Sequence, residues 1–170
     1  MSVLQLYLKR GFKLGMSLGL GVSSILPATT ALAAPAPIFE PILDDITPTN
    51  FRLPTDVPTD MELYPSIQPG GSILFLNTEP GCENIECTAL VVAREPEAPP
   101  LWPFIGVNPF KSFDLGDGVR AHFWERDGMA SLQWIQGDAF YVLTYRQSIF
   151  SEAAAIAMAT SMATEPPFTP

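Results

Sequence analysis

The strongest constraint on the fold is a turn dipeptide that recurs every ten residues in the C-terminal half of the chain. Asp117-Gly118, Asp127-Gly128 and Gly137-Asp138 each separate two runs of residues that suit β-strands. Such dipeptides supply the positive φ angles that tight hairpin turns require. Residues 111–146 are therefore predicted to form a meander of antiparallel strands.

Two-residue loops at the second and third turns give registers that agree with each other. The second turn pairs Phe123 with Leu132, and the third pairs Trp134 with Tyr141. All four side chains then lie on one apolar face of the meander.

The first turn fits a three-residue loop, Gly116–Gly118, better than a two-residue one. The longer loop sets Phe113 beside Ala121 and leaves Asp114 opposite Arg120 on the outer face. A two-residue turn would direct the Asp114 carboxylate into the core, which costs several kcal/mol unless the charge is paired.

A helix is predicted directly after the last strand. Ser151 suits the N-cap position, Glu152 lies at the positive end of the helix dipole, and the segment EAAAIAMATSMA is rich in strong helix formers. The helix is expected to end before Pro166. We expect Ile156 and its neighbours to lie on the sheet and to cover its aromatic side chains, Phe123, Trp134, Tyr141 and Tyr145.

The chain before residue 111 is interrupted by prolines. Residues 34–71 predict a Pro-rich arm with one short helical turn around Ile38 to Ile46. Ser72 to Asn77 and Ile85 to Arg94 predict a hairpin, and EPEAPPLWPF a polyproline-like connection. The predicted fold class is α+β: a curved antiparallel sheet of about six strands with one C-terminal helix packed on it. Its single domain covers residues 72–165, and residues 166–170 are expected to form a disordered tail.

The N-terminus has the features of a cleavable secretory signal. An uncharged apolar run from Leu14 to Leu26 follows a basic leader, and Ala31-Leu32-Ala33 matches the small-residue pattern of a cleavage site. Residues 1–33 are therefore predicted to be a signal peptide. An uncleaved anchor is disfavoured because the run is shorter than the roughly 20 residues of a spanning helix. The choice between the Sec and twin-arginine routes stays open.

Without that leader the chain is strongly acidic. Removing Lys9, Arg10 and Lys13 from the 9 Lys+Arg of the sequence leaves 6 basic residues against 18 acidic ones. A net charge of this sign repels nucleic-acid phosphates and anionic headgroups. We therefore expect a secreted or periplasmic protein that binds no nucleic acid and keeps no stable membrane anchor.

The two cysteines, Cys82 and Cys87, are predicted to form a disulfide, because export brings them into an oxidising compartment. The disulfide would close a small ring, so in the chain-entropy model it stabilises the fold by only about 2 kcal/mol and constrains a turn rather than the whole fold. The acidic neighbours Glu83 and Glu86 disfavour a redox-active thiolate. The loop also lacks the ligand spacing of a calcium site.

The sequence carries no recognisable catalytic motif. His122 is the single histidine, and Glu125 lies three residues further along the same strand, hence on its other face, which argues against a zinc site. No nucleophile elbow or phosphate-binding glycine loop occurs. A non-catalytic protein without metal or cofactor is therefore predicted, with a carboxylate hydrolase as the less favoured alternative.

The outer face of the meander carries the candidate binding residues. Four apolar side chains project there together with four basic ones: Trp124, Ile135, Phe140 and Val142 with Arg120, His122, Arg126 and Arg146. One interpretation is that the Pro-rich arm or another strand covers this face, since apolar patches of this size are uncommon on monomers. The other is a partner or ligand surface whose basic rim attracts an anionic partner.

Two segments carry a resemblance to a known family. LQWIQGDAFYVL followed by SEAAAIAMATSM resembles the end of an uncharacterised bacterial extracytoplasmic domain, a domain of unknown function found alone or in anti-sigma-type proteins. The matching residues are Leu132, Trp134, Gly137, Tyr141, Leu143, Glu152, Ile156, Ala157 and Met162. The resemblance implies a curved sheet with a helix in an accessory or sensory role. The acidic, Pro-rich, exported character is also similar to that of cyanobacterial proteins, which adds the thylakoid lumen to the compartments considered.

These observations together predict an exported, non-catalytic accessory or interaction protein of the bacterial cell envelope. The alternative is a carrier or sensor that holds an apolar or amphipathic ligand between the sheet and the helix. Packing under the helix separates the two: a filled interface favours the first and a cavity the second.

Overall fold

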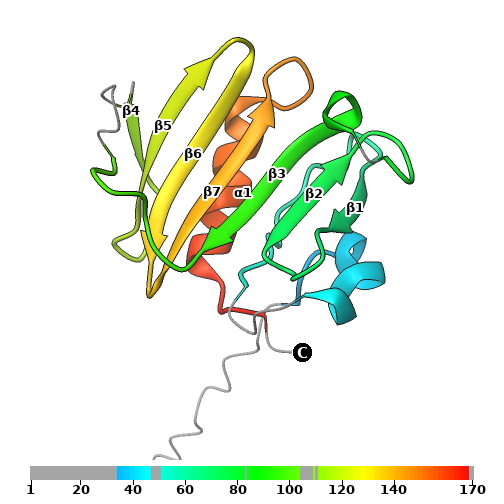
Figure 1. Cartoon of the computed structure of the whole chain (residues 1–170), viewed down its shortest axis with the longest axis horizontal. Coiled ribbons are helices and arrows are strands. Elements are labelled where there is room, and N and C mark those ends of the chain that lie inside the picture. The colour runs from blue at the N-terminus through cyan, green and yellow to red at the C-terminus, as the bar shows by residue number, and fades with distance from the viewer. Residues whose placement is uncertain (1–33, 47–50, 83, 104–108, 110, 169–170) are drawn as a thin grey trace, which may run out of the picture. The chain divides into compact units, whose positions relative to one another are not determined.

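A computed structural model describes residues 34–46, 51–82, 84–103, 109 and 111–168 (Figure 1). All of them fall within one unit of the chain, Ala31–Pro170. The predicted signal peptide, residues 1–33, lies outside the described residues, so its cleavage stays a prediction. Among the described residues, no helix is both long and apolar enough to cross a membrane.

The strands form one antiparallel sheet of seven: β1 (Tyr64–Ile67), β2 (Ile73–Asn77), β3 (Thr88–Glu95), β4 (Lys111–Asp114), β5 (Arg120–Arg126), β6 (Met129–Gln136) and β7 (Ala139–Arg146). Their order across the sheet is β1-β2-β3-β7-β6-β5-β4, so the predicted hairpin of β2 and β3 extends the meander along β7 (Figure 1). The predicted α+β class is confirmed, with one strand more than expected.

The added strand, β1, lies in the segment predicted to be a Pro-rich arm. The Gln68 N–H donates to the Ile73 carbonyl at 2.9 Å. In an antiparallel pair of strands, every second residue points its N–H toward the partner strand, and the residues between point theirs away. Gln68 points its N–H toward β2, so Pro65, three residues earlier and opposite Leu76, occupies a position where the N–H would point away from β2. Proline therefore costs no hydrogen bond inside the sheet, and it leaves the free edge with one donor fewer.

The meander has the predicted registers. The confirmed pairs are Phe123 with Leu132, Trp134 with Tyr141, Phe113 with Ala121 and Asp114 with Arg120. Asp117 and Asp127 have φ angles of 51° and 54°, so the aspartates of the first two turns occupy the left-handed region. Local turn chemistry therefore sets which side chains share a face.

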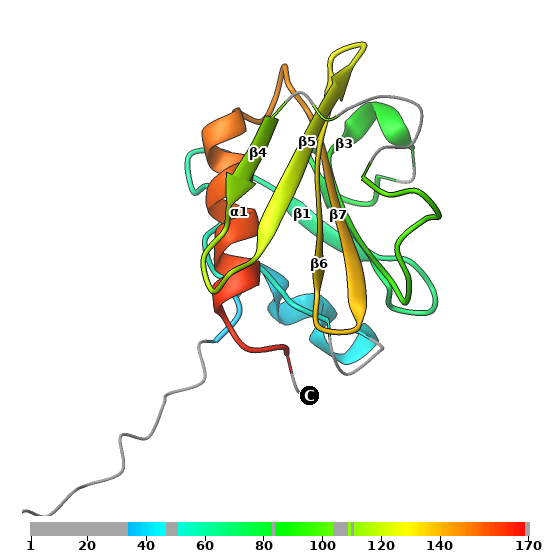
Figure 2. The same ribbon diagram turned by 90° about the vertical axis from the view of Figure 1, so that its left-hand side faces the viewer.

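Helix α1 (Glu152–Thr164) begins at the predicted N-cap, where Ser151 Oγ accepts the Ala154 N–H at 3.1 Å. It lies on one face of the sheet (Figures 1 and 2). Its core-facing side chains are all 0% exposed: Ala155, Met158, Ala159 and Met162. Ile156, which we expected on the sheet, is half-buried beside this core, because the small alanines and the methionines fill the contact instead.

The Pro-rich arm packs on the same face as α1. It contains the 3-10 helix η1 (Pro37–Asp45), and the Phe51 ring meets Tyr141 edge-on, with centroids 6.5 Å apart. The Arg52 guanidinium donates to the carbonyls of Met162 and Glu165 at the end of α1. These contacts satisfy carbonyl groups that a helix end leaves without partners.

The domain is therefore longer than residues 72–165. Its core begins at Ala36. Beyond α1, in the segment predicted to be a disordered tail, the Phe168 N–H donates to the Phe51 carbonyl at 2.9 Å, and the Phe168 side chain packs against the core. The arm's scattered apolar residues lack a helix or strand period, so their burial could not be foreseen from the pattern.

Candidate binding surface on the open face of the sheet

The open face is the face of the sheet turned away from α1. Side chains alternate along a strand, so each residue next to a buried core position points to the open face. In Figure 2, α1 lies on one side of the sheet, and the green segments that precede and follow β3 lie on the other. This face carries the binding residues predicted from the sequence.

Trp102, from the Pro-rich connection after β3, is seated on the open face. Its ring meets the His122 ring edge-on with centroids 5.1 Å apart, and the Phe140 ring at 5.4 Å. Its Nε1–H donates to Gln133 Oε1 at 3.2 Å. Phe140 is only 3% exposed as a result. Among the described residues, Trp102 covers the patch in part, while the Pro-rich arm lies on the helix side.

The remaining apolar residues predicted for this face are more accessible. Trp124 continues the aromatic line, with its ring 6.0 Å from that of His122. Ile135 is 45% exposed, and Val142 is half-buried. The aromatic row, as we name Phe140, Trp102, His122 and Trp124, thus runs across β7, β6 and β5.

The basic residues of this face have different surroundings. Arg120 is exposed and lies opposite Asp114. Arg126 forms an ion pair with Asp127 at 3.1 Å, but both side chains are largely exposed, so the pair contributes little. Arg146 is turned toward another segment, since its Nη2 donates to the Ile85 carbonyl at 2.6 Å. Arg120 and Arg126 therefore form the accessible basic rim.

His122 sits between the aromatic rings and the basic rim. Its Nδ1 lies 3.3 Å from Ser112 Oγ. Burial, and secondly the positive charge of Arg120, lower the pKa of the His122 ring. The aromatic row is therefore neutral at neutral pH, and it becomes charged only on acidification.

Metal-ligating side chains do not cluster among the described residues. Within the described ranges, no group of three His, Cys, Asp or Glu side chains is placed to hold a metal ion. Glu125, the carboxylate nearest His122 along the strand, accepts a hydrogen bond from Gln147 Nε2 at 3.0 Å.

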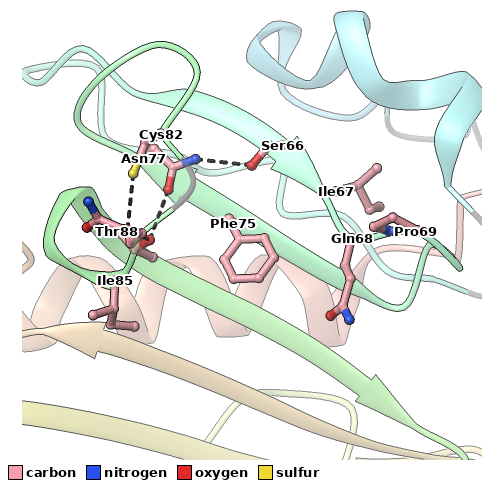
Figure 3. Close-up of a pocket in the computed structure, with 10 residues that line it drawn as sticks. Ser66, Ile67, Gln68, Pro69, Phe75, Asn77, Cys82, Ile85 and Thr88 are labelled. Atoms are coloured by element: carbon pink, nitrogen blue, oxygen red, sulfur yellow. Dashed lines mark hydrogen bonds between the residues drawn. The ribbon is translucent and has the colours of Figure 1, made fainter.

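The other end of the open face carries the cystine loop, residues 78–87 (Figure 3). The predicted disulfide between Cys82 and Cys87 is confirmed, with the two Cα atoms 6.2 Å apart. The loop includes a short 3-10 helix, η2 (Ile85–Cys87). A cavity of about 390 Å³ lies between the loop, β1 and β2. Sequence reasoning did not predict this cavity.

Sequence reasoning also missed Trp102 and Gln133. A tryptophan among prolines was the available signal, because a ring of this size rarely stays fully exposed. The partner of that ring could not be foreseen, since it depends on how the connection crosses the sheet.

Comparison of the chain with protein-family models, with curated protein sequences and with solved structures gives no match. The resemblance to an extracytoplasmic domain family therefore stays a prediction, and the function has to be argued from the residues of the open face.

Proposed function

We propose that this chain is an exported, non-catalytic accessory protein of the bacterial cell envelope that binds a partner protein through the open face of its sheet. The aromatic row carries the proposal. Trp124 is half-buried at one end of this row. At the other end Ile135, opposite Phe140, is 45% exposed, and Arg120 on the same face is exposed. Tryptophan and arginine are the residues most often found at the energetic centres of protein interfaces.

The charge distribution favours a partner segment that combines acidic and apolar side chains. Three of the six basic residues after position 33, Arg120, Arg126 and Arg146, lie on the open face. The other three are held elsewhere: Arg52 at the end of α1, Arg94 beside Asp138 and Lys111 beside Glu152. The acidic remainder of the surface repels such a segment and steers it to this face.

Packing under the helix supports an interaction protein over a carrier that holds a ligand there. The core-facing residues of α1 are fully buried. Trp134 and Tyr145, on the sheet beneath, are each 0% exposed. A ligand between sheet and helix would have to displace this core.

Export is the second part of the proposal. The leader pattern of residues 1–33 and a disulfide, which persists in oxidising compartments, support it. We assign secretion or the periplasm, or the thylakoid lumen in a cyanobacterial cell. The mass of the chain recovered from the source organism tests this part: a chain beginning at Ala34 is expected, and one that keeps residue 1 contradicts cleavage.

Site-specific photocrosslinking in the source organism tests the binding face. A benzoylphenylalanine at Ile135, on the open face, is expected to give a discrete crosslinked product. The same probe at the exposed Thr59, on the Pro-rich arm, is the control. The crosslinked partner is expected to contact position 135 through a segment rich in Asp and Glu.

Substitutions on the open face test whether the crosslinked product at position 135 forms through this surface. Trp124→Ala and Arg120→Gln are expected to lower its yield severalfold, whereas Arg120→Lys keeps the charge and most of the yield. Equal products at positions 135 and 59, or a yield indifferent to Trp124→Ala, would contradict the proposal.

A further inference from the structure

We propose that the cavity beneath the cystine loop is a binding site for a neutral sugar ring. This inference goes beyond the proposed function, because the cavity lies over β1 and β2, away from the aromatic row. Its volume, about 390 Å³, falls within the roughly 300–1,000 Å³ that small-molecule sites occupy.

Uncharged side chains of two kinds line the cavity. Figure 3 shows the Phe75 ring at its centre, with Ile85 at one end and Ile67 and Pro69 at the other. Side-chain amides and hydroxyls, together with the disulfide-bonded Cys82, supply the rest of the lining: Ser66, Gln68, Asn77, Asn84 and Thr88. None of the described lining residues carries a charge.

One wall of the cavity is a hydrogen-bonded polar network. Asn77 Nδ2 donates to Ser66 Oγ at 3.1 Å, and Thr88 Oγ1 donates to Asn77 Oδ1 at 3.1 Å (Figure 3). Asn77 is 3% exposed and Thr88 7% exposed. This wall places polar groups at buried positions, where a purely structural strand pair would carry apolar ones.

A β-bulge creates that wall. Leu76 lies opposite Leu90, but Asn77 lies opposite Thr88, so Ala89 is the extra residue in β3. In an unbroken register, Asn77 would have met the alanine and the network would be absent. Bulges re-aim side chains in this way and are enriched next to functional sites.

The loop that borders the cavity is held in place by hydrogen bonds of its own. The Thr78 N–H donates to the Cys87 carbonyl at 2.8 Å across the base of the loop. Asn84 Oδ1 accepts the Glu86 N–H at 2.6 Å, and Arg146 holds the Ile85 carbonyl from β7. A preformed wall lowers the ordering cost of binding.

The chemistry of the lining selects the ligand class. A charged ligand would lose its hydration here without gaining a counter-charge. A hydrocarbon would remove water from the Gln68 amide and from the remaining hydrogen-bonding capacity of Asn77 and Ser66, and would offer no hydrogen bond in return. A sugar ring matches both kinds of lining, because its C–H face can lie on the Phe75 ring while its hydroxyls reach the amides. Gln68, for which the described residues provide no side-chain hydrogen bond, is the exposed amide at the rim.

Nuclear magnetic resonance titration of the full chain with N,N′-diacetylchitobiose and with cellobiose tests the proposal. We expect weak binding, with a Kd of about 1 mM, for at least one of these neutral disaccharides. The shifted amide signals should be those of β1, the cystine loop and Phe75. Cyclohexanol, an apolar ring, and glucuronic acid, a charged one, are the matched probes and should bind at least tenfold more weakly.

Three variants, one of them a control, locate the binding. Phe75→Leu should weaken binding about tenfold by removing the ring. Ile73→Leu, on the same strand and face but outside the cavity, should change nothing. Gln68→Ala is expected to weaken binding severalfold. Because the Gln68 side chain is exposed, this substitution should not disturb the fold.

Tighter binding of cyclohexanol than of either disaccharide would overturn the proposal, as would shifts confined to the aromatic row or the absence of shifts. Equal effects of Phe75→Leu and Ile73→Leu would do the same. Crosslinking at Ile135 is expected to be unaffected by Phe75→Leu. The two experiments can therefore contradict the sugar-binding proposal and the proposed partner binding separately.

Discussion

Two tryptophans on neighbouring strands show how differently the two faces of this sheet are used. Trp134, on β6, points to the helix side, is 0% exposed and stacks on Tyr141 with ring centroids 5.3 Å apart. Trp124, on β5, points to the open face and keeps part of its ring in solvent. The same residue type thus belongs to the core on one face and to a surface on the other.

The two faces of the sheet differ in how completely they are covered, and this difference separates the residues that stabilise the fold from those available for binding. The helix face is closed by α1, the arm and Phe168, which together bury every core-facing aromatic ring of β5 to β7. The open face is closed only in part, by Trp102 and the cystine loop. Substitutions on the helix face should therefore unfold the protein, and those on the open face should alter binding with little change in stability.

The largest expected effect is that of Trp134→Ala. The substitution removes a fully buried ring from a filled core, and we expect a loss of about 3 to 5 kcal/mol in the free energy of unfolding. Trp124→Ala is the matched control and should cost under about 1 kcal/mol. Chemical denaturation of both variants measures the contrast. Equal losses would show that the open face is as much a part of the core as the helix face.

The second prediction concerns high pH and Tyr145. Burial, followed by the charges of Glu152 and Glu125, raises the pKa of the Tyr145 hydroxyl to about 12. An unfolded tyrosine loses its proton near pH 10. Between these values the unfolded state binds fewer protons, so stability is complete below about pH 10 and falls as the pH rises toward 12.

The loss across that window should be on the order of 2 kcal/mol. Urea unfolding of the native chain and of Tyr145→Phe at several pH values measures it. The Tyr145 hydroxyl is buried without a hydrogen-bond partner among the described residues, so Tyr145→Phe should cost little at neutral pH. A variant as sensitive to alkali as the native chain would exclude Tyr145 as the cause.

The third prediction concerns the start of α1. Ser151→Ala removes the side-chain acceptor of the Ala154 N–H, and we expect a loss of about 1 kcal/mol. Ser148→Ala, in the exposed turn before the helix, should leave stability unchanged. Thermal unfolding monitored by circular dichroism compares the two. A loss shared equally by both would mean that the cap bond contributes nothing specific.

The sequence predicted the meander well because its determinants are local. Each Asp-Gly or Gly-Asp pair fixes a turn, and a turn fixes the register of the two strands beside it. The placement of Phe123 and Trp134 on the helix face followed from that alone. The N-cap at Ser151 was equally local.

The missed features all depend on contacts between distant segments. β1 is a strand although Pro65 interrupts its pattern, because that proline faces the free edge. Trp102 reaches His122 only because the connection after β3 crosses the open face. The cavity depends on the bulge at Ala89, which one extra residue creates and which no periodicity reveals.

The smallest expected effect is the loss of stability when His122 takes up a proton at low pH. The pKa of His122 also reports directly on how far Trp102 covers the open face. The chain has one histidine, so its ring signals can be assigned without further variants. Because the folded pKa is lowered, stability is complete above the unfolded value near 6.5 and is lost as the pH falls through the folded one.

The causes of the shift can be ranked by substitution. Burial is the larger cause and Arg120 the smaller, so Trp102→Ala should raise the pKa of His122 more than Arg120→Gln does. Arg126→Gln, which removes an exposed charge held by Asp127, should leave it unchanged. A larger response to Arg120→Gln would mean that charge rather than ring contact controls His122. An acidic partner bound at this face should raise the same pKa, which makes the histidine a reporter of the proposed interaction.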